Sequence, residues 1–325
     1  MAALYPWLET SRRSLFDQLT QDRMPHALLI TGMPGVGKQA LAGHLVNMLL
    51  CAQRSPDGQP CGRCPACTQL EAGTHPDFLR LQPEEDSSVI KVDQVRALSE
   101  ALSLTAHGQG FKAAVVSPAE AMNINAANSL LKTLEEPSDN TVLVLVSDQP
   151  AQLPATVRSR CQRVRVDVPD RALALEWLAG HLPEASQADT CLQLAGGAPL
   201  LALALARDNI IEARRERLDE LVGILDGRTA ALGVAEGWSK DEDMQGLRWL
   251  RGWVMDLLRI RVTGQTHYIY SVDLLDTLSV LARRLDSKVL FGLLDAVNRA
   301  LRSGSSSLNR QLMTEDLLLA WAAQQ

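Results

Sequence analysis

The sequence predicts an α/β domain built on a parallel sheet, followed by an all-helical region. Short apolar runs alternate with amphipathic segments up to residue 168, and a glycine-rich turn joins the first run to the first helix. No further strand-like run stands out after Pro169. Strands that are apolar on both faces and alternate with helices are typical of a parallel sheet covered on both sides.

The elements of the first domain follow from the spacing of apolar residues. Strands are expected at five apolar runs, 26–31, 77–81, 111–117, 141–147 and 162–168. Helices are expected at 38–50, 92–104, 121–136 and 153–161. Pro137 stops the third of these helices, because proline cannot donate the backbone hydrogen bond that a helix needs.

The second half of the chain has the pattern of packed helices. Residues 170–206 give two or three short helices around LAGGAP at 194–199, and residues 208–325 give long amphipathic segments. Segments with one leucine-rich face need partners for that face, so a helical bundle is expected. We therefore expect three domains, with bounds of 1–168, 169–207 and 208–325.

Composition excludes several classes of function. The 325 residues carry a net charge of −6, which argues against gripping nucleic acid by charge alone. Aromatic residues are only 4% of the chain, so a surface for stacking bases is not expected. No apolar run is long enough to span a membrane, and the N-terminal residues lack the apolar core of a signal peptide. The sequence therefore predicts a cytoplasmic protein that does not enter a membrane.

Four cysteines lie close together in a segment that we predict to be a metal-binding module, residues 51–75. Cys51, Cys61, Cys64 and Cys67 give the spacing C-x9-C-x2-C-x2-C. Four thiolates suit a closed tetrahedral zinc site, which is structural because no position remains for water. Such a site supplies roughly 10–16 kcal/mol of apparent binding energy to a module with little core.

Two other interpretations of the cysteines remain open. An iron–sulfur cluster is one, since C-x2-C-x2-C also occurs in ferredoxins, although those usually place the fourth cysteine downstream. Here the fourth cysteine, Cys51, lies upstream. Four unliganded thiols are the other interpretation, and the density of cysteines weighs against it. Spacing favours zinc.

Residues 32–40, GMPGVGKQA, nearly match a phosphate-binding P-loop. Gly32, Gly35, Gly37 and Lys38 are the candidate nucleotide-binding residues, and the loop lies between an expected strand and an expected helix, as a P-loop does. The position after the lysine should be Ser or Thr, whose hydroxyl holds Mg²⁺, but it is Gln39. Phosphate binding therefore remains open, and metal binding is weakened.

A second magnesium ligand is also missing. A P-loop ATPase needs a carboxylate at the end of a buried strand to hold Mg²⁺ and orient water. The expected strand at 111–117 runs into Ser117–Pro118, and Glu120 lies beyond it. Two losses together predict little or no ATP hydrolysis by this chain.

Two stretches resemble a known family. They are INAANSLLKTLEEPSDNTVLVLVS at 124–147 and LPATVRSRC at 153–161. With the altered P-loop, the inserted cysteines and AGTHPD at 72–77, they resemble the delta-prime family of bacterial DNA polymerase III clamp-loader subunits. The resemblance covers the whole chain.

The resemblance implies an architecture and a set of partners. It implies an AAA+ ATPase-like module with an inserted zinc module, a small helical lid over 169–207 and a helical collar over 208–325. The implied partners are the ATPase (gamma/tau) and delta subunits, the sliding clamp and, through the complex, primed DNA. The complex belongs to the DNA polymerase III holoenzyme, and ATP is expected in the neighbouring subunits.

The resemblance also implies roles for single residues. Arg160 matches the SRC arginine that reaches into a neighbour's ATP site as an arginine finger. Pro199 stands near the position where the ATPase relatives carry an arginine that senses the γ-phosphate. A third residue that ATP hydrolysis requires is therefore missing, in addition to the two magnesium ligands. The leading hypothesis is thus a non-hydrolysing clamp-loader subunit. The alternatives are a weakly active AAA+ ATPase, which Lys38 favours, and a zinc-dependent DNA-binding protein, which the acidic balance opposes.

Overall fold

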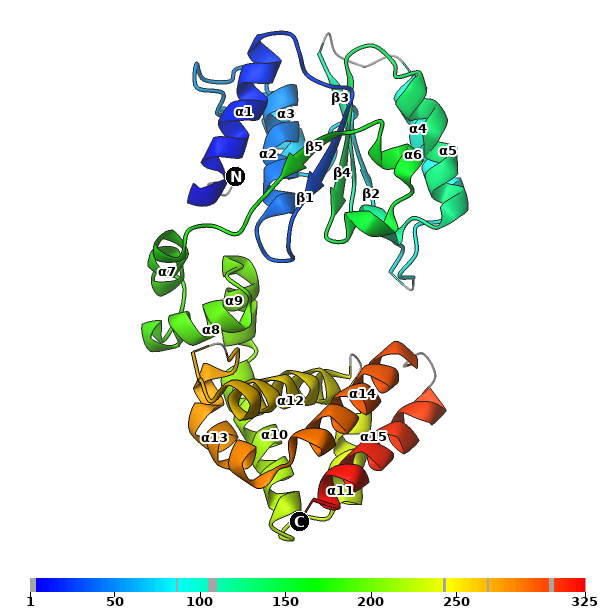
Figure 1. The fold of residues 1–325 in the computed structure, drawn as a ribbon. Helices are drawn as coiled ribbons and strands as arrows, with labels where there is room; N and C mark the ends of the chain where they lie inside the picture. The colour runs from blue at the N-terminus through cyan, green and yellow to red at the C-terminus, as the bar shows by residue number, and fades with distance from the viewer. Residues whose placement is uncertain are drawn as a thin grey trace. The chain divides into compact units, whose positions relative to one another are not determined.

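The computed structural model describes residues 4–85, 87–104, 110–241, 244–267, 269–303 and 307–324. The chain divides into two compact units (Figure 1). Unit 1 comprises Met1–Trp177 and Gly197–Leu201, and unit 2 comprises Leu178–Gly196 and Ala202–Gln325. The helices α7 (Arg171–Ala179) and α9 (Pro199–Arg207) therefore contribute residues to both units.

Unit 1 is built on a five-stranded sheet with the order β2-β3-β4-β1-β5. The strands are β1 (Ala27–Thr31), β2 (Phe78–Leu81), β3 (Lys112–Val116), β4 (Thr141–Ser147) and β5 (Gln162–Arg165). Every neighbouring pair is parallel. The register of β1 places Ala27 opposite Leu143 and Leu28 opposite Gln162, so the strand that leads into the glycine-rich turn lies between β4 and β5.

Helices cover both faces of this sheet. They are α1 (Glu9–Thr20), α2 (Lys38–Leu50), α3 (Pro65–Glu71), α4 (Val92–Ser103), α5 (Ile124–Glu135) and α6 (Ala155–Arg158). Figure 1 shows α1, α2 and α3 on one face and α4, α5 and α6 on the other. Short 3-10 turns precede α1, at Pro6–Leu8, and α5, at Ala119–Ala121.

The alternation of side chains along the strands supplies two cores. Leu28 and Ile30 pack into the core beneath α1 and α2, while Leu29 packs into the core beneath α4 and α5. All three side chains are fully buried, and each such burial contributes about 1.5–3 kcal/mol. Two-sided burial is why the strand segments read as continuous apolar runs.

Unit 2 is a bundle of helices around one large apolar core. Its main helices are α8 (Ala188–Leu194), α10 (Ile210–Leu225), α11 (Ala231–Ser239), α12 (Gln245–Thr263), α13 (Leu275–Arg284), α14 (Ser287–Ser303) and α15 (Ser307–Ala322). The core draws on every helix from α10 to α15. Trp321 of α15 is buried and its indole N–H donates to the Leu221 carbonyl of α10, 2.9 Å away.

A buried polar network links residues 270–273 to α10 and α12. The carboxylate of Asp256, fully buried on α12, accepts the backbone N–H groups of Tyr270 and Ser271 at 3.0 and 2.9 Å. Arg214 of α10 donates to the Ser271 hydroxyl at 2.9 Å and pairs with Asp273 at 3.3 Å. Because an unpaired buried charge is costly, these contacts stabilise the positions of residues 270–273 against the two helices.

The predicted fold class is confirmed: a parallel α/β sheet is followed by an all-helical region. Two helices of unit 1, α1 and α3, were not predicted from the sequence. The helix predicted at 121–136 begins later, because Asn123 accepts the backbone N–H of Ala126 at 2.8 Å and so caps α5. Among the described residues, no single helix is both long and apolar enough to cross a membrane, and one pair of short helices bent by 117° qualifies only when joined.

Candidate functional site

The glycine-rich turn between β1 and α2 has the backbone of a P-loop. Gly35 and Gly37 have φ values of +78° and +95°, a left-handed conformation that side chains disfavour. A Cβ added at Gly35 would lie 2.5 Å from the backbone nitrogen of Leu201, so only glycine fits there. Gly37 is the N-cap of α2, and the loop therefore leads directly into a helix N-terminus.

Lys38 lies at the first position of α2 and its side chain is buried. Its ammonium group donates to the Met33 carbonyl at 2.6 Å and pairs with the Asp148 carboxylate at 2.6 Å. Asp148 follows the last residue of β4, the strand next to β1. The lysine is thus held by the protein itself.

The two positions that lack magnesium ligands contact one another. The Gln39 side-chain amide donates to the Ser117 hydroxyl at 3.3 Å, across the gap between α2 and the end of β3. The Glu120 carboxylate accepts the backbone N–H groups of Asp148 and Gln149 at 2.9 and 3.1 Å. A cavity of about 360 Å³ lies beside the P-loop, lined by Lys38, Gln39 and Asp148 among others.

The four cysteines converge at the other end of α2. Cys51 ends α2, Cys64 caps α3, and Cys67 lies within α3. The four sulfurs lie within 4.8 Å of one another, and those of Cys51 and Cys64 are 4.0 Å apart. Tetrahedral bonds of about 2.3 Å separate sulfurs by about 3.8 Å, so Cys51, Cys61, Cys64 and Cys67 are positioned to bind one metal ion.

Hydrogen bonds prepare the cysteine sulfurs for a cation. The backbone N–H of Cys61 donates to the Cys51 sulfur, and that of Cys64 to the Cys61 sulfur, each at 3.3 Å. Burial raises the pKa of the Cys64 thiol, but hydrogen bonds from the backbone of Cys67 and Ala52 outweigh it and lower that pKa to about 6. Burial and a hydrogen bond with Cys64 raise the pKa of Cys67 to about 12. A bound cation displaces the remaining protons.

Polar anchors fasten the cysteine segment to α1 and α2. Buried Arg12 of α1 donates to the Asp57 carbonyl at 2.5 Å, and Arg54 donates to the Met48 carbonyl of α2 at 2.8 Å. Gly58 has a φ of +85°, and a Cβ there would lie 2.3 Å from the ring of Phe16. Glycine is therefore required where this loop crosses α1.

Arg160 lies just after α6 and has no direct contact with the P-loop among the described residues. Its guanidinium pairs with the Glu135 carboxylate of α5 at 2.6 Å and donates to the Thr156 carbonyl at 3.0 Å. About a third of the side chain is exposed. The neighbouring Cys161 is buried, and burial raises the pKa of its thiol to about 11. The segment therefore anchors itself through Cys161 while Arg160 reaches solvent.

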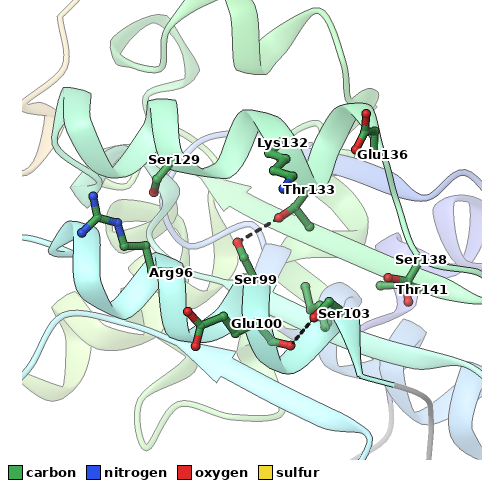
Figure 2. A pocket seen from close by; sticks show the side chains of 11 residues that line it. Arg96, Ser99, Glu100, Ser103, Ser129, Lys132, Thr133, Glu136, Ser138 and Thr141 are labelled. Atoms are coloured by element: carbon green, nitrogen blue, oxygen red, sulfur yellow. Dashed lines mark hydrogen bonds between the residues drawn. The ribbon is translucent and has the colours of Figure 1, made fainter.

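Figure 2 shows a further cavity, of about 380 Å³, between α4 and α5. Hydroxyl groups dominate its lining, and the Thr133 hydroxyl donates to that of Ser99 at 2.8 Å, which ties the two helices together. The cations that line it, Arg96 and Lys132, are balanced by Glu100 and Glu136. The cavity lies apart from the P-loop and from the cysteines.

Two side chains at these sites, Asp148 and Glu135, were not identified from the sequence. Asp148 carried a signal that could have been used, because it follows a buried strand and the carboxyl ends of parallel strands are where ligand-binding residues gather. Glu135, at the end of α5, carried no such signal. Glu120 was considered from the sequence only as a magnesium ligand, and in the structure it accepts backbone hydrogen bonds.

The fold and these sites define a P-loop module with altered magnesium positions, combined with a four-cysteine metal site and a helical bundle. Two family models match: "DNA polymerase III, delta subunit" over residues 8–170 and "DNA polymerase III, delta subunit, C terminal" over residues 208–323. The chain belongs to the family of DNA polymerase III delta-prime subunits.

Similar proteins span nearly the full length. A DNA polymerase III subunit delta' of Pseudomonas aeruginosa is 38% identical over 99% of this chain and 98% of its own length. One from Escherichia coli is 35% identical over 97% and 94%. A solved structure of a gamma subunit-related protein from Thermotoga maritima aligns with a TM-score of 0.47 and 21% identity, covering 98% of this chain and 99% of that chain.

Proposed function

We propose that this chain is a clamp-loader subunit that does not hydrolyse ATP and helps to place the sliding clamp on primed DNA. Its partners in the cytoplasm are the ATPase (gamma/tau) and delta subunits of DNA polymerase III. Family membership over the whole chain supports this role. The altered P-loop supports the absence of turnover, because Gln39 and Ser117 replace the expected magnesium ligands.

The observation that carries the proposal is the contrast between Lys38 and Arg160. Lys38 is buried and paired within its own module, whereas Arg160 reaches the surface of unit 1 with about a third of its side chain exposed. An arginine supplied to a neighbour's ATP site neutralises charge that develops on the transferred phosphoryl group. We propose that Arg160 acts in this way, completing a site that belongs to a neighbouring subunit.

The cysteine site is proposed to hold zinc in a structural role. Four thiols whose sulfurs lie within 4.8 Å of one another can supply all four ligands of a closed site, which is the arrangement of structural zinc. Within residues 51–67 the only basic residues are Arg54 and Arg63, and Arg54 is engaged with the Met48 carbonyl. This arrangement offers little to a DNA backbone, so a structural role is favoured over DNA binding.

Assembly is proposed to reside in residues 208–325, as a collar, with 169–207 as a lid. The bundle of α10 to α15 buries one continuous core, yet Phe291, Leu312 and Leu319 stay about half exposed or more. A fragment that ends near Arg207 should retain the cysteine site and fail to join the complex. Gel filtration with the other subunits tests this, and a fragment that assembled normally would remove the collar assignment.

The test of the central role uses the reconstituted complex. Arg160→Ala should lower ATP hydrolysis stimulated by DNA and clamp, because an arginine finger contributes about 10³–10⁵ in rate at its own site. The fall for the whole complex is partial, since other sites have their own arginines. Arg165→Ala is the matched control, because Arg165 is an exposed arginine on β5, close in sequence, that pairs with Asp167.

Three outcomes separate the hypotheses. Lys38→Ala should have a much smaller effect than Arg160→Ala. If Lys38→Ala is the more damaging change, the chain is itself an ATPase. If Arg160→Ala and Arg165→Ala are both without effect, the chain is a passive scaffold.

A further inference from the structure

The P-loop of this chain already holds an anion, the side chain of Asp148. The Asp148 carboxylate lies 2.6 Å from the Lys38 ammonium group, in the cavity of about 360 Å³ beside the loop. In a nucleotide-binding P-loop the lysine reaches the outer phosphates instead. We propose that Asp148 occupies the phosphate position next to Lys38 and thereby excludes nucleoside phosphates from the loop.

The contacts of Lys38 leave it little capacity for a phosphate. An ammonium group has three donors, and two of them are engaged at 2.6 Å by Asp148 and by the Met33 carbonyl of the loop itself. The side chain is buried, so releasing the carboxylate without a replacement would leave a charge unpaired. A phosphate must therefore displace Asp148 before it can bind.

Asp148 is held in place by a second carboxylate. Glu120 accepts the backbone N–H groups of both Asp148 and Gln149, at 2.9 and 3.1 Å. This double hydrogen bond fixes the chain just after β4 and directs it toward Lys38. Hydrogen bonds to an ionised acceptor are about twice as strong as neutral ones, so the position of Asp148 is well determined.

The two positions that would carry magnesium ligands are also occupied by each other. Gln39 donates to Ser117 at 3.3 Å, and neither residue is of the type expected to hold the ion. The backbone N–H of Leu200 donates to the Gly35 carbonyl at 3.0 Å, so the start of α9 packs on the loop. With Asp148 beside Lys38 and without the expected magnesium ligands, the loop as it stands does not fit a magnesium nucleotide.

Electrostatic repulsion by the Asp148 carboxylate is the reason why nucleoside phosphates would be excluded from the loop. A triphosphate placed beside Lys38 would meet the Asp148 carboxylate at close range, and like charges at such distances repel by several kcal/mol in a partly buried site. The ligand binds only the fraction of molecules in which Lys38 is free, and its apparent affinity falls by that fraction. Removing the carboxylate should therefore restore binding.

The test measures binding to the isolated full-length chain by calorimetry, with MgATP and with inorganic pyrophosphate as probes. Asp148→Asn keeps the size of the side chain and removes its charge. It should bind both probes roughly 10- to 100-fold more tightly than the wild-type chain. Asp148→Asn combined with Lys38→Ala should lose this gain. None of these proteins should hydrolyse ATP, because Gln39 and Ser117 are unchanged.

Asp93→Asn is the matched control. It makes the same charge change at an exposed carboxylate of unit 1, which pairs with Arg96 on α4. Its affinity for both probes should equal that of the wild-type chain. A gain in Asp93→Asn equal to that in Asp148→Asn would assign the effect to net charge and overturn the proposal.

Two further results would overturn it. One is Lys38-dependent binding of MgATP by the wild-type chain as tight as that of Asp148→Asn. The other is no gain in Asp148→Asn or in Asp148→Ala, each shown to be folded by circular dichroism. The Asp148 side chain is 41% exposed, so both variants are expected to fold. This proposal is independent of the role of Arg160. It is tested by the binding of MgATP and pyrophosphate to the isolated chain, so its failure would leave the clamp-loader role intact.

Discussion

The two ends of α2 carry loops that are held together in opposite ways. At the first end, the P-loop is satisfied by groups of the protein, namely Asp148, the Met33 carbonyl and the Leu200 N–H. At the last end, Cys51 joins three other thiols, and the four sulfurs lie within 4.8 Å of one another. The first loop is held by groups of the protein itself, and the second brings together four thiols that are positioned to bind a metal ion.

The comparison shows how a P-loop backbone can be held by contacts within the protein. The left-handed glycines stand next to a lysine whose ammonium group is paired with Asp148 and bonded to the Met33 carbonyl. The cysteine segment has no comparable substitute, since its apolar cluster consists of little besides the cysteines themselves. Stability at the first end should therefore not depend on a ligand, and stability at the second should.

Metal removal should produce the largest effect and should be confined to one end of α2. Cys64→Ser, or a strong chelator, should remove the metal and free residues 51–75, because a structural zinc supplies roughly 10–16 kcal/mol of apparent energy to such a site. The rate of backbone hydrogen exchange, measured by mass spectrometry, should rise in that segment. Elemental analysis should find one zinc per wild-type chain and none in the variant.

The internal control for this prediction is α10 to α15. Exchange in those helices should be unchanged, because their core is separate from the cysteine cluster. Iron in the purified protein would show that the four cysteines bind an iron–sulfur cluster and not zinc. Unchanged exchange of residues 51–75 after chelation would show that both ends of α2 are self-sufficient, and the comparison would fail.

The cysteine segment also depends on its passage across α1, and two glycines test this. Gly58→Ala should cost about 2–4 kcal/mol in unfolding free energy, since it combines a left-handed φ with a clash against Phe16. Gly62→Ala is the matched control, because Gly62 has a similar φ of +71° but open space around its Cα. It should cost about 1–2 kcal/mol. Equal costs in urea unfolding would show that the contact with Phe16 contributes nothing.

The sequence predicted the regular parts of this arrangement well. The bounds of α2 and β4 were those expected, because each is a continuous apolar or amphipathic run bounded by clear signals. The convergence of the cysteines followed from their spacing, which is a local property. Local patterns of this kind depend only on neighbouring residues.

Other parts could not be predicted because they depend on how distant segments meet. The pair of Lys38 and Asp148 is separated by 110 positions and exists only because β4 lies beside β1, an order that periodicity does not specify. The helix α1 was missed because its charged residues, such as buried Arg12, obscure its apolar face. Arg12 is buried where it donates to the Asp57 carbonyl of the cysteine segment, a contact between distant parts of the sequence.

A smaller effect is expected at the P-loop end. Glu120→Ala removes the acceptor of two backbone N–H groups and should lower the unfolding free energy by about 1–2 kcal/mol. Glu120→Gln keeps a carbonyl oxygen in the same place and should cost less than half as much. Urea denaturation of the full chain measures both. Identical losses would mean that charge, and not the hydrogen bonds, matters at this position.

The smallest effect should come from the ion pair of Arg160. Glu135→Gln should change the unfolding free energy by less than about 1 kcal/mol, because both side chains are partly exposed and such pairs contribute little. The difference should vanish in about 1 M salt, where screening is nearly complete. A loss as large as that of Glu120→Ala, persisting in salt, would show that this pair is structural.

The contacts of Arg160 with Glu135 and the Thr156 carbonyl bear on the thermodynamics of association. A free arginine side chain carries about 2 kcal/mol of rotamer entropy, much of which is lost when an interface immobilises it. Here the guanidinium is already confined by two partners when the chain folds. In the role proposed for Arg160, docking on a neighbouring subunit would exchange the Glu135 carboxylate for a phosphate while the side chain is already partly ordered. Part of the entropic cost of ordering the arginine would then be met during folding and not on association.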